Sequence, residues 1–322
     1  MVPIKIISAL AAEHYENIKF NLLNQIERVL DDGGIQKRPQ GSAASIIGFS
    51  DQLEDDLESY ISDPETNLKP LIILKPDLLE NRIDELIIDR PNYLNVWHDD
   101  NLILKNIFID NAYESNAFDK WKFINNINID TCPYCNRNYI YTSKKNKKVK
   151  PEIDHFYPKH KYPILGLSYY NLIPSCETCN GFACKHTKDP FTEHIKSPYL
   201  INKGDFVISH KIKKISIINP LSGKSDVDVF FKKNPLIEPN LLTFNLENLY
   251  ELHYDHAIEL VIKRNLKYSK KYRDYLKSYS TLKFSDSEID RMILGNYALE
   301  KEQHKRPLSK MYQDIGKELG LI

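Results

Sequence analysis

Five cysteines, all within 53 residues, are the side chains of this sequence best suited to binding a metal. Four of them form two C-x-x-C pairs, Cys132 with Cys135 and Cys176 with Cys179, and 40 residues separate the pairs. A C-x-x-C turn directs two thiolates to one point, and two such turns complete a tetrahedral zinc site. A redox-active pair would need no second copy, so the spacing predicts a structural Zn²⁺ with no open position. We expect the fifth cysteine, Cys184, to be a buried free thiol.

A second group of polar residues lies around the later pair. Asp154 and His155 are adjacent, Asn171 follows them, and Asn180 comes directly after Cys179. A carboxylate is a hard oxygen ligand that suits Mg²⁺ or Mn²⁺, and a neutral imidazole can take a proton from water near pH 7. Phosphodiester hydrolysis needs both an activated water and a cation that neutralises developing charge. An Asp-His dipeptide is common by chance, but in this setting it is a candidate hydrolytic site.

The order of these residues resembles the HNH endonuclease family, whose fold is called ββα-metal. The resemblance rests on EIDHFYPK and YNLIPSCETCN, and on the nine-residue step from Asn171 to Asn180, which is similar to that in the HNH domains of CRISPR RNA-guided nucleases. The flanking C-x-x-C pairs resemble zinc-containing HNH nucleases of bacterial anti-phage systems of the Septu type. The resemblance covers residues 131–190 and continues more weakly through NPLIEP, FNLENLYELHYDHA and RPLSKMYQDI, whereas residues 1–125 resemble no family that we can name.

The resemblance implies a role for each residue of the group. His155 would be the general base, and Asp154 and Asn180 would bind a catalytic Mg²⁺ or Mn²⁺. Asn171 would orient the His155 ring through its second nitrogen, a contact that fixes the tautomer. Adjacent strand residues point to opposite faces, so Asp154 and His155 can share a site only where the strand is distorted or ends. The four cysteines would then serve the architecture alone.

Three further polar residues lie close to the group in sequence. Glu152 would share a strand face with Asp154, where it could assist metal binding or belong to the solvated surface. His186 could take the family position given to Asn180 if the alignment shifts. His160, in the loop PKHKYP, suits a surface or phosphate-contacting position.

Charge is unevenly distributed along a chain whose formal net charge is zero. Residues 1–130 carry 12 Lys/Arg against 23 Asp/Glu, residues 131–215 carry 15 against 6, and residues 216–322 carry 17 against 15. A basic middle segment suits a polyanionic substrate, although a charged run is often only a solvated surface. Lys185 and the run 144–150 are candidate phosphate contacts, and the run also suits a solvated hairpin tip. The acidic first segment is better suited to contacting a protein partner.

Four other residues could suggest sites but have simpler explanations. His253 and His256 are three apart on an expected helix without a supporting carboxylate, so we expect them to pack rather than bind metal. Trp97 and Trp121 are expected in the core rather than as platforms for stacking bases.

Apolar spacing predicts helices in the first part of the chain and again in the last. Helices are expected over 13–31, 50–61, 76–88 and 99–126, and the run 69–76 is expected to be a buried strand or loop. The alternating segment 207–219 predicts a strand that pairs with 226–231. After Pro239 the helical segments are 245–280, 285–303 and 305–320.

The fold class predicted from these elements is α+β. We expect a mostly helical protein around a ββα-metal (HNH) nuclease core, with a structural zinc and a short extra β-hairpin. The expected division is an acidic helical region at 1–126 for a partner or for regulation, a zinc-containing HNH core at 127–205, and a β segment with helices at 206–322.

The function predicted from the resemblance is a metal-dependent endonuclease, acting on DNA as the effector of an anti-phage system beside an ATPase or sensor protein. Two alternatives stay open: a zinc-knuckle nucleic-acid-binding protein without catalysis, and a freestanding restriction-type HNH nuclease. The first would need the cysteines but not Asp154, His155, Asn171 and Asn180 together. The N-terminus lacks a signal-peptide pattern and no apolar run is long enough to span a bilayer, so we expect a cytoplasmic protein without membrane contact.

Overall fold

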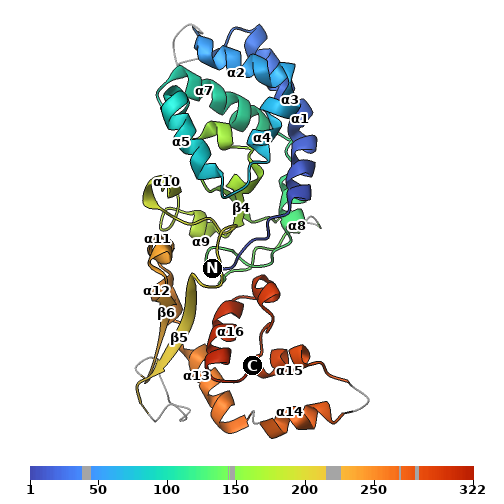
Figure 1. The fold of residues 1–322 in the computed structure, drawn as a ribbon, viewed down its shortest axis with the longest axis vertical. Helices are drawn as coiled ribbons and strands as arrows, with labels where there is room; N and C mark the ends of the chain where they lie inside the picture. The colour runs from blue at the N-terminus through green and yellow to red at the C-terminus, as the bar shows by residue number, and fades with distance from the viewer. Residues whose placement is uncertain (38–44, 144, 146–148, 215–225, 268–269, 280–282) are drawn as a thin grey trace.

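A computed structural model describes residues 1–37, 45–143, 145, 149–214, 226–267, 270–279 and 283–322. These residues form helices and three small two-stranded antiparallel sheets. The molecule is elongated, with the N-terminal helices at one end, the C-terminal elements at the other and a short hairpin between them (Figure 1). Among the described residues, no helix is both long and apolar enough to cross a membrane.

The N-terminal end is a group of helices around one core. Its elements are α1 (Ser8–Asp31), β1 (Ile35–Lys37), β2 (Ser45–Ile47), α2 (Asp51–Ser62), α3 (Pro64–Asn67), α4 (Lys69–Ile72), α5 (Leu79–Asp89), α6 (Pro91–Leu94), α7 (Asp99–Lys105), the π-helix η1 (Asn106–Tyr113) and α8 (Lys120–Ile127). Helix α1 buries residues at helical spacing, among them Tyr15, Ile18 and Leu22. Gly34 follows it with φ of +136°, a conformation that favours glycine.

A buried aspartate joins two of these helices. The Ser50 side chain caps α2 by accepting from the Leu53 amide. The Ser50 amide and hydroxyl both donate to the carboxylate of Asp100, at 2.9 and 2.7 Å, and Asp100 is fully buried in α7. The start of α2 is therefore fixed against α7.

Two expectations for this part of the chain need correction. The run 69–76, expected as a strand or loop, begins with the short helix α4, because Pro70 stands in its first turn where no backbone N–H is needed. The helix expected over 99–126 is divided into α7, η1 and α8. The break lies at 114–119, where the Asp119 side chain accepts from two backbone amides and begins α8.

The central part contains a small hairpin and a helix in the order β-β-α. Its elements are β3 (Glu152–His155), the 3₁₀ turns η2 (Pro163–Leu165) and η3 (Tyr169–Asn171), β4 (Leu172–Ser175), α9 (Glu177–Asn180) and α10 (Pro190–Glu193). Strands β3 and β4 are antiparallel, with Asp154 opposite Ile173 and His155 opposite Leu172. β4 is buried along its whole length, and β3 is buried except for its first residue, Glu152.

The C-terminal part is built on a second hairpin. Its elements are β5 (Phe206–Ile212), β6 (Val227–Lys233), η6 (Pro235–Ile237), α11 (Glu238–Thr243), α12 (Leu246–Glu251), α13 (Tyr254–Ile262), the π-helix η7 (Lys263–Lys267), α14 (Lys270–Lys277), α15 (Asp286–Leu294), η8 (Glu300–Lys305) and α16 (Ser309–Glu318). The predicted pairing of 207–219 with 226–231 is confirmed for its described part, and residues 215–219 lie outside the described residues. The segments expected to be helical after Pro239 contain helices, but 245–280 is divided into α12, α13, η7 and α14, and 285–303 into α15 and the start of η8; residues 268–269 and 280 lie outside the described residues.

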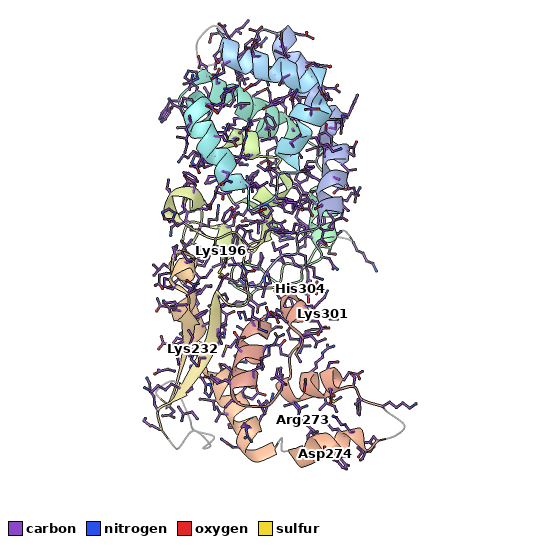
Figure 2. The ribbon with its side chains drawn as sticks, in the orientation of Figure 1. Lys196, Lys232, Arg273, Asp274, Lys301 and His304 are labelled. Carbon is purple, nitrogen blue, oxygen red and sulfur yellow. The ribbon has the colours of Figure 1, made fainter. Side chains whose placement is uncertain are left out.

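Side-chain contacts join the C-terminal elements to the centre. Asn240 of α11 donates to the backbone oxygen of Lys196 and accepts from its amide, at 2.7 and 2.8 Å. Lys232 of β6 donates to Glu318 of α16 at 2.7 Å, so the hairpin and the last helix are held together. Lys196 and Lys232 are labelled in Figure 2, on the side of the molecule where the second hairpin lies.

A buried histidine connects α1 to the central part. His14 is 6% exposed, its Nε2–H donates to the Leu167 carbonyl at 2.9 Å, and its ring packs against Phe118 and Tyr169. Burial lowers the pKa of His14 from 6.5 to about 4, and the hydrogen bond to Leu167 opposes that shift. The folded protein therefore holds this side chain in its neutral form at pH 7.

We predict that His14 makes stability fall as the pH drops from about 6.5 to about 4. In that window the unfolded chain binds a proton that the folded chain excludes, so stability is full above the window and is lost on acidification. His14→Gln should remove about 1.4 kcal/mol of the loss between pH 7 and pH 5.5. Urea unfolding at both pH values measures it. The exposed His194, changed to Asn, is the control, and an equal acid dependence in wild type and His14→Gln would refute the prediction.

Candidate functional site

The two C-x-x-C pairs meet in a buried cluster. The Sγ atoms of Cys132, Cys135, Cys176 and Cys179 all lie within 4.8 Å of one another, and all four residues are buried. Zn–S bonds of 2.3 Å in a tetrahedron place the sulfur atoms about 3.8 Å apart. The donor set and its spacing fit that geometry, so the cluster could hold a zinc ion with four thiolate ligands. This bears out the predicted composition of the cysteine cluster.

Short turns orient the cysteine side chains. The Asn136 amide donates to the Cys132 carbonyl at 2.8 Å, and the Cys179 amide donates to the Cys176 carbonyl at 3.1 Å. Two N–H groups also approach the sulfur atoms: the Arg137 amide donates to Cys135 Sγ at 3.4 Å and the Asn138 side chain to Cys176 Sγ at 3.3 Å. Donors of this kind favour the thiolate form that a metal requires.

Asn136 connects the cluster to the C-terminal part of the chain. It is fully buried in the left-handed conformation, with φ of +49°. Its side chain donates to Thr131 and to the Gln303 carbonyl, and accepts from the Lys310 amide. Its own carbonyl accepts from the Leu308 amide at 2.6 Å. The first cysteine turn and the start of α16 are thereby fixed to each other.

Cys184 is buried, as expected, and is not one of the four clustered cysteines. The Cys184 amide donates to the Gly181 carbonyl, and Lys185 follows Cys184 in the chain. Burial raises the pKa of the Cys184 thiol. The structure therefore separates one neutral thiol from the four that are placed for metal binding.

The Asp154 carboxylate is buried and both of its oxygens have partners. Asp154 is 4% exposed. Tyr134, which lies inside the first C-x-x-C pair, donates to Oδ2 at 2.5 Å, and the Lys185 ammonium donates to Oδ1 at 3.0 Å. Each carboxylate oxygen has a second lone pair, so these bonds leave room for one further ligand contact.

Lys185 differs from the phosphate contact that was expected. It is fully buried, and its Nζ donates to the His155 carbonyl at 2.8 Å as well as to Asp154. A buried ammonium needs a counter-charge and hydrogen bonds, and Asp154 and the His155 carbonyl supply them. Lys185 therefore holds Asp154 and His155 in place from the interior of the protein. It does not face solvent, so it cannot be the phosphate contact.

His155 is the last residue of β3, which lets it share a site with Asp154. It is 7% exposed, its Nε2–H donates to the Gly166 carbonyl at 3.0 Å, and Tyr113 packs edge-on against its ring. That bond assigns the proton to Nε2 and the lone pair to Nδ1. Burial, and next the positive charge of Lys159, lower the pKa of His155 to about 3.

Asn171 does not orient the His155 ring directly, contrary to the expectation. It is fully buried, its Oδ1 accepts from the Tyr157 amide at 2.7 Å, and its Nδ2 donates to the Leu165 carbonyl at 2.9 Å. Asn171 thus closes the loop between the two strands, and the carbonyl that holds His155 belongs to Gly166 of that loop. A Cβ on Gly166 would lie 2.0 Å from Ile109 Cδ1, which explains the glycine.

Four residues considered from the sequence line one cavity. Asp154, His155, Asn180 and Glu152 all line a cavity of about 420 Å³. Asn180, at the end of α9, donates through Nδ2 to Glu152 Oε2 at 2.7 Å. Glu152 and Asp154 share a face of β3, so the cavity combines oxygen donors with the His155 imidazole.

Basic side chains also line this cavity. Lys120 and Lys159 donate to the same carboxylate, Glu114, at 2.6 and 2.8 Å, and this pair of cations holds the pKa of Glu114 at about 2. His160 and His186, the two other imidazoles considered above, line the cavity as well. The cavity lining thus carries both signs of charge, with Lys120, Lys150 and Lys159 against Glu114, Glu152 and Asp154. The tip of the run 144–150 lies outside the described residues at 144 and 146–148.

Sequence reasoning missed three residues of this site. Tyr134 and Gly166 bond Asp154 and His155, and Glu114 pairs with the basic residues. The position of Tyr134 between two ligand cysteines is a signal that could have found it. Gly166 and Glu114 act through a backbone carbonyl and a contact between distant elements, and neither leaves a pattern in the sequence.

The simpler explanations hold for the distant histidines but fail for one tryptophan. His253 accepts from Arg137 Nε at 3.0 Å and His256 bonds the Tyr312 hydroxyl at 2.6 Å, so both contribute to packing around the C-terminal helices. Trp97, expected in the core, is 88% exposed at the loop before α7. Trp121 is half-buried.

We predict that Cys176→Ser releases the zinc and destabilises the folded protein, because metal-binding energy at such a cluster is folding energy. Metal analysis and thermal unfolding of the purified full chain measure both effects. Cys184→Ser, which also replaces a buried thiol, is the matched control and should keep its zinc. An unchanged zinc content in Cys176→Ser would show that the cluster does not bind metal through that sulfur.

Part of this chain is similar in sequence to a known protein. No family model matches the sequence, and no solved structure matches it. The chain is 34% identical over 116 residues to the Septu protein PtuB of Bacillus thuringiensis. The match covers 34% of this chain and 40% of that protein. The chain is therefore related, over about a third of its residues, to a Septu protein.

Proposed function

We propose that this protein is a metal-dependent endonuclease of the HNH type that hydrolyses phosphodiester bonds, most naturally those of DNA. The observation that carries the proposal is the shared cavity of Asp154, His155 and Asn180, which lies on a β-β-α segment beside the four cysteines. The relationship to the Septu protein PtuB and the resemblance of the segment to HNH nucleases support it. The cysteines would hold a structural Zn²⁺ and take no part in the chemistry.

His155 would act as the general base. Its Nδ1 carries the lone pair, because Nε2–H is donated to the Gly166 carbonyl. Taking a proton from water would place a positive charge on the ring, and the bond from Nε2–H to the Gly166 carbonyl would then strengthen. Asn171 supports this step indirectly, because it holds the loop that carries Gly166.

Asp154 and Asn180 would hold a divalent cation such as Mg²⁺ or Mn²⁺, with Glu152 beside them. All three offer oxygen atoms, the donor type that these ions prefer. The Asn180 bond to Glu152 uses Nδ2, which leaves the Asn180 Oδ1 for a ligand contact. When bound, the ion would supply neutralisation of the charge that develops on the phosphate and on the leaving oxygen.

A nucleic acid is the substrate that the charges favour. Residues 131–215 carry an excess of nine positive charges, with 15 Lys/Arg against 6 Asp/Glu, and Lys120, Lys150 and Lys159 line the cavity. Phosphate neutralisation by such groups drives binding and makes it sensitive to salt. We assign DNA as the substrate by resemblance to the HNH family.

We predict that His155→Ala lowers the cleavage of plasmid DNA in Mg²⁺ or Mn²⁺ by at least about 100-fold, because a general base contributes roughly 100- to 10,000-fold. The variant should keep its zinc and stay folded, with some loss of thermal stability because His155 is buried, so zinc content and circular dichroism separate loss of chemistry from loss of fold. His194→Asn, an exposed histidine in the left-handed conformation that asparagine tolerates, is the control and should cleave normally.

Full activity in a verified His155→Ala sample would contradict the mechanism. If wild-type protein binds DNA but cleaves none with either metal, the zinc-knuckle binding protein without catalysis becomes the better description.

We also propose a role in anti-phage defence, with an ATPase or sensor protein as partner. The relationship to a Septu protein supports the role. The acidic N-terminal part, with 12 Lys/Arg against 23 Asp/Glu in residues 1–130, is the part that suits a protein surface rather than DNA. Ile88, at 77%, and Trp97, at 88%, are among the large apolar side chains exposed there.

A double variant, Ile88→Ser with Trp97→Ala, removes both apolar side chains. It should reduce co-purification of an ATPase encoded beside this protein by at least about 10-fold, because Trp is among the residue types that contribute most to interface energies. DNA cleavage by the isolated variant should not change. Phe20→Ala on α1, which removes another exposed aromatic ring, is the control. Unchanged co-purification would remove this surface from the proposal.

A further inference from the structure

Phe182 is an exposed aromatic residue at the edge of the candidate site. Its side chain is 89% exposed. Its ring is stacked on that of His186, with ring centroids 3.8 Å apart and an interplanar angle of 24°. His186 lines the same cavity as Asp154 and His155. Phe182 and His186 therefore form a stacked pair that reaches from the cavity into solvent.

The backbone that carries Phe182 is held at several points. The Gly181 amide donates to the Glu177 carbonyl at 2.8 Å, and the Cys184 amide donates to the Gly181 carbonyl at 3.1 Å. The Lys185 amide donates to the Cys179 carbonyl at 3.1 Å, and the Lys185 side chain is buried beneath Asp154. The aromatic ring is therefore presented on a segment fixed to the cysteine cluster rather than on a free loop.

We propose that Phe182, supported by His186, is a platform on which a nucleobase of the substrate stacks next to the cleaved phosphate, so that the substrate is a strand with an unpaired base. The proposal rests on the proposed function and names the substrate class of the same cavity.

The chemistry of the pair favours a base over other occupants. One face of the Phe182 ring is covered by His186, and the exposed remainder is flat, apolar and next to a cavity whose lining includes three lysines. Base–aromatic stacking is tolerant of sequence and is the usual means by which proteins hold single strands. In an intact duplex, neighbouring bases cover both faces of each base, so only an unpaired or flipped base has a free face for Phe182.

The test measures binding of DNA without cleavage. Full-length, zinc-containing protein with no added Mg²⁺ or Mn²⁺ is titrated into a single-stranded oligonucleotide that carries 2-aminopurine, and into the matching duplex. Phe182→Ala should weaken single-strand binding by about 5- to 100-fold and abolish the stacking quench of 2-aminopurine. Phe182→Tyr keeps an aromatic ring and should stay within about 3-fold of wild type. The slope of log Kd against log salt should not change, because no phosphate contact is removed.

Zinc content and thermal midpoint verify that both variants are folded. Equal affinity of wild type and Phe182→Ala for the single strand would overturn the proposal, and so would an equal loss on single strand and duplex. Either result, with His155→Ala still inactive, leaves the nuclease function in place. If wild-type protein binds neither DNA, the stacking proposal and the nuclease proposal fail together, so the two failures are distinguishable.

Discussion

The arrangement of this protein depends on four sulfur atoms within 4.8 Å of one another in a buried pocket. Four thiols so placed cannot all ionise without a divalent cation between them, and a cation bound there would stabilise the segments that the turns around it hold. The turns hold both ends of the chain. The Val2 amide donates to the Pro133 carbonyl, and Asn136 bonds the segment around Gln303 and Leu308. The cysteine cluster thus lies where the N-terminal helices, the central hairpin and the C-terminal helices come together.

The same turns supply the electrostatic support of the candidate site. A carboxylate as buried as Asp154 would be costly alone, and it is balanced by one hydroxyl and one ammonium. The hydroxyl belongs to Tyr134, inside the first cysteine pair, and the ammonium to Lys185, just after the second. Both groups reach the carboxylate because the two pairs meet. The cysteine cluster is therefore structural in a specific sense: it brings together the partners of Asp154.

Much of this arrangement can be predicted from the sequence, and the features that were not predicted have physical explanations. The cysteine cluster followed from spacing, and the β5–β6 hairpin followed from alternation, because both patterns are local. The roles of Lys185 and Gly166 were missed because they depend on burial and on a carbonyl from a loop folded back over β3. Trp97 was misplaced because composition favours a buried indole while its position before α7 exposes it. The site roles of Asp154, His155 and Asn180 stay predictions that cleavage assays decide.

The contact between Lys185 and Asp154 affects how tightly the folded protein would depend on each of its two proposed cations, the structural Zn²⁺ and the catalytic Mg²⁺ or Mn²⁺. The Asp154 carboxylate already has a positive partner at 3.0 Å, so the backbone around it does not depend on a second cation to stay folded. A divalent ion at the cavity could leave and return within the lifetime of the folded protein. The donors that the described residues place on the cysteine sulfur atoms, the Arg137 amide and the Asn138 side chain, are neutral N–H groups, so they do not replace a cation there. One cation would be acquired once, at folding, and the other would follow the free Mg²⁺ or Mn²⁺ concentration of the surroundings.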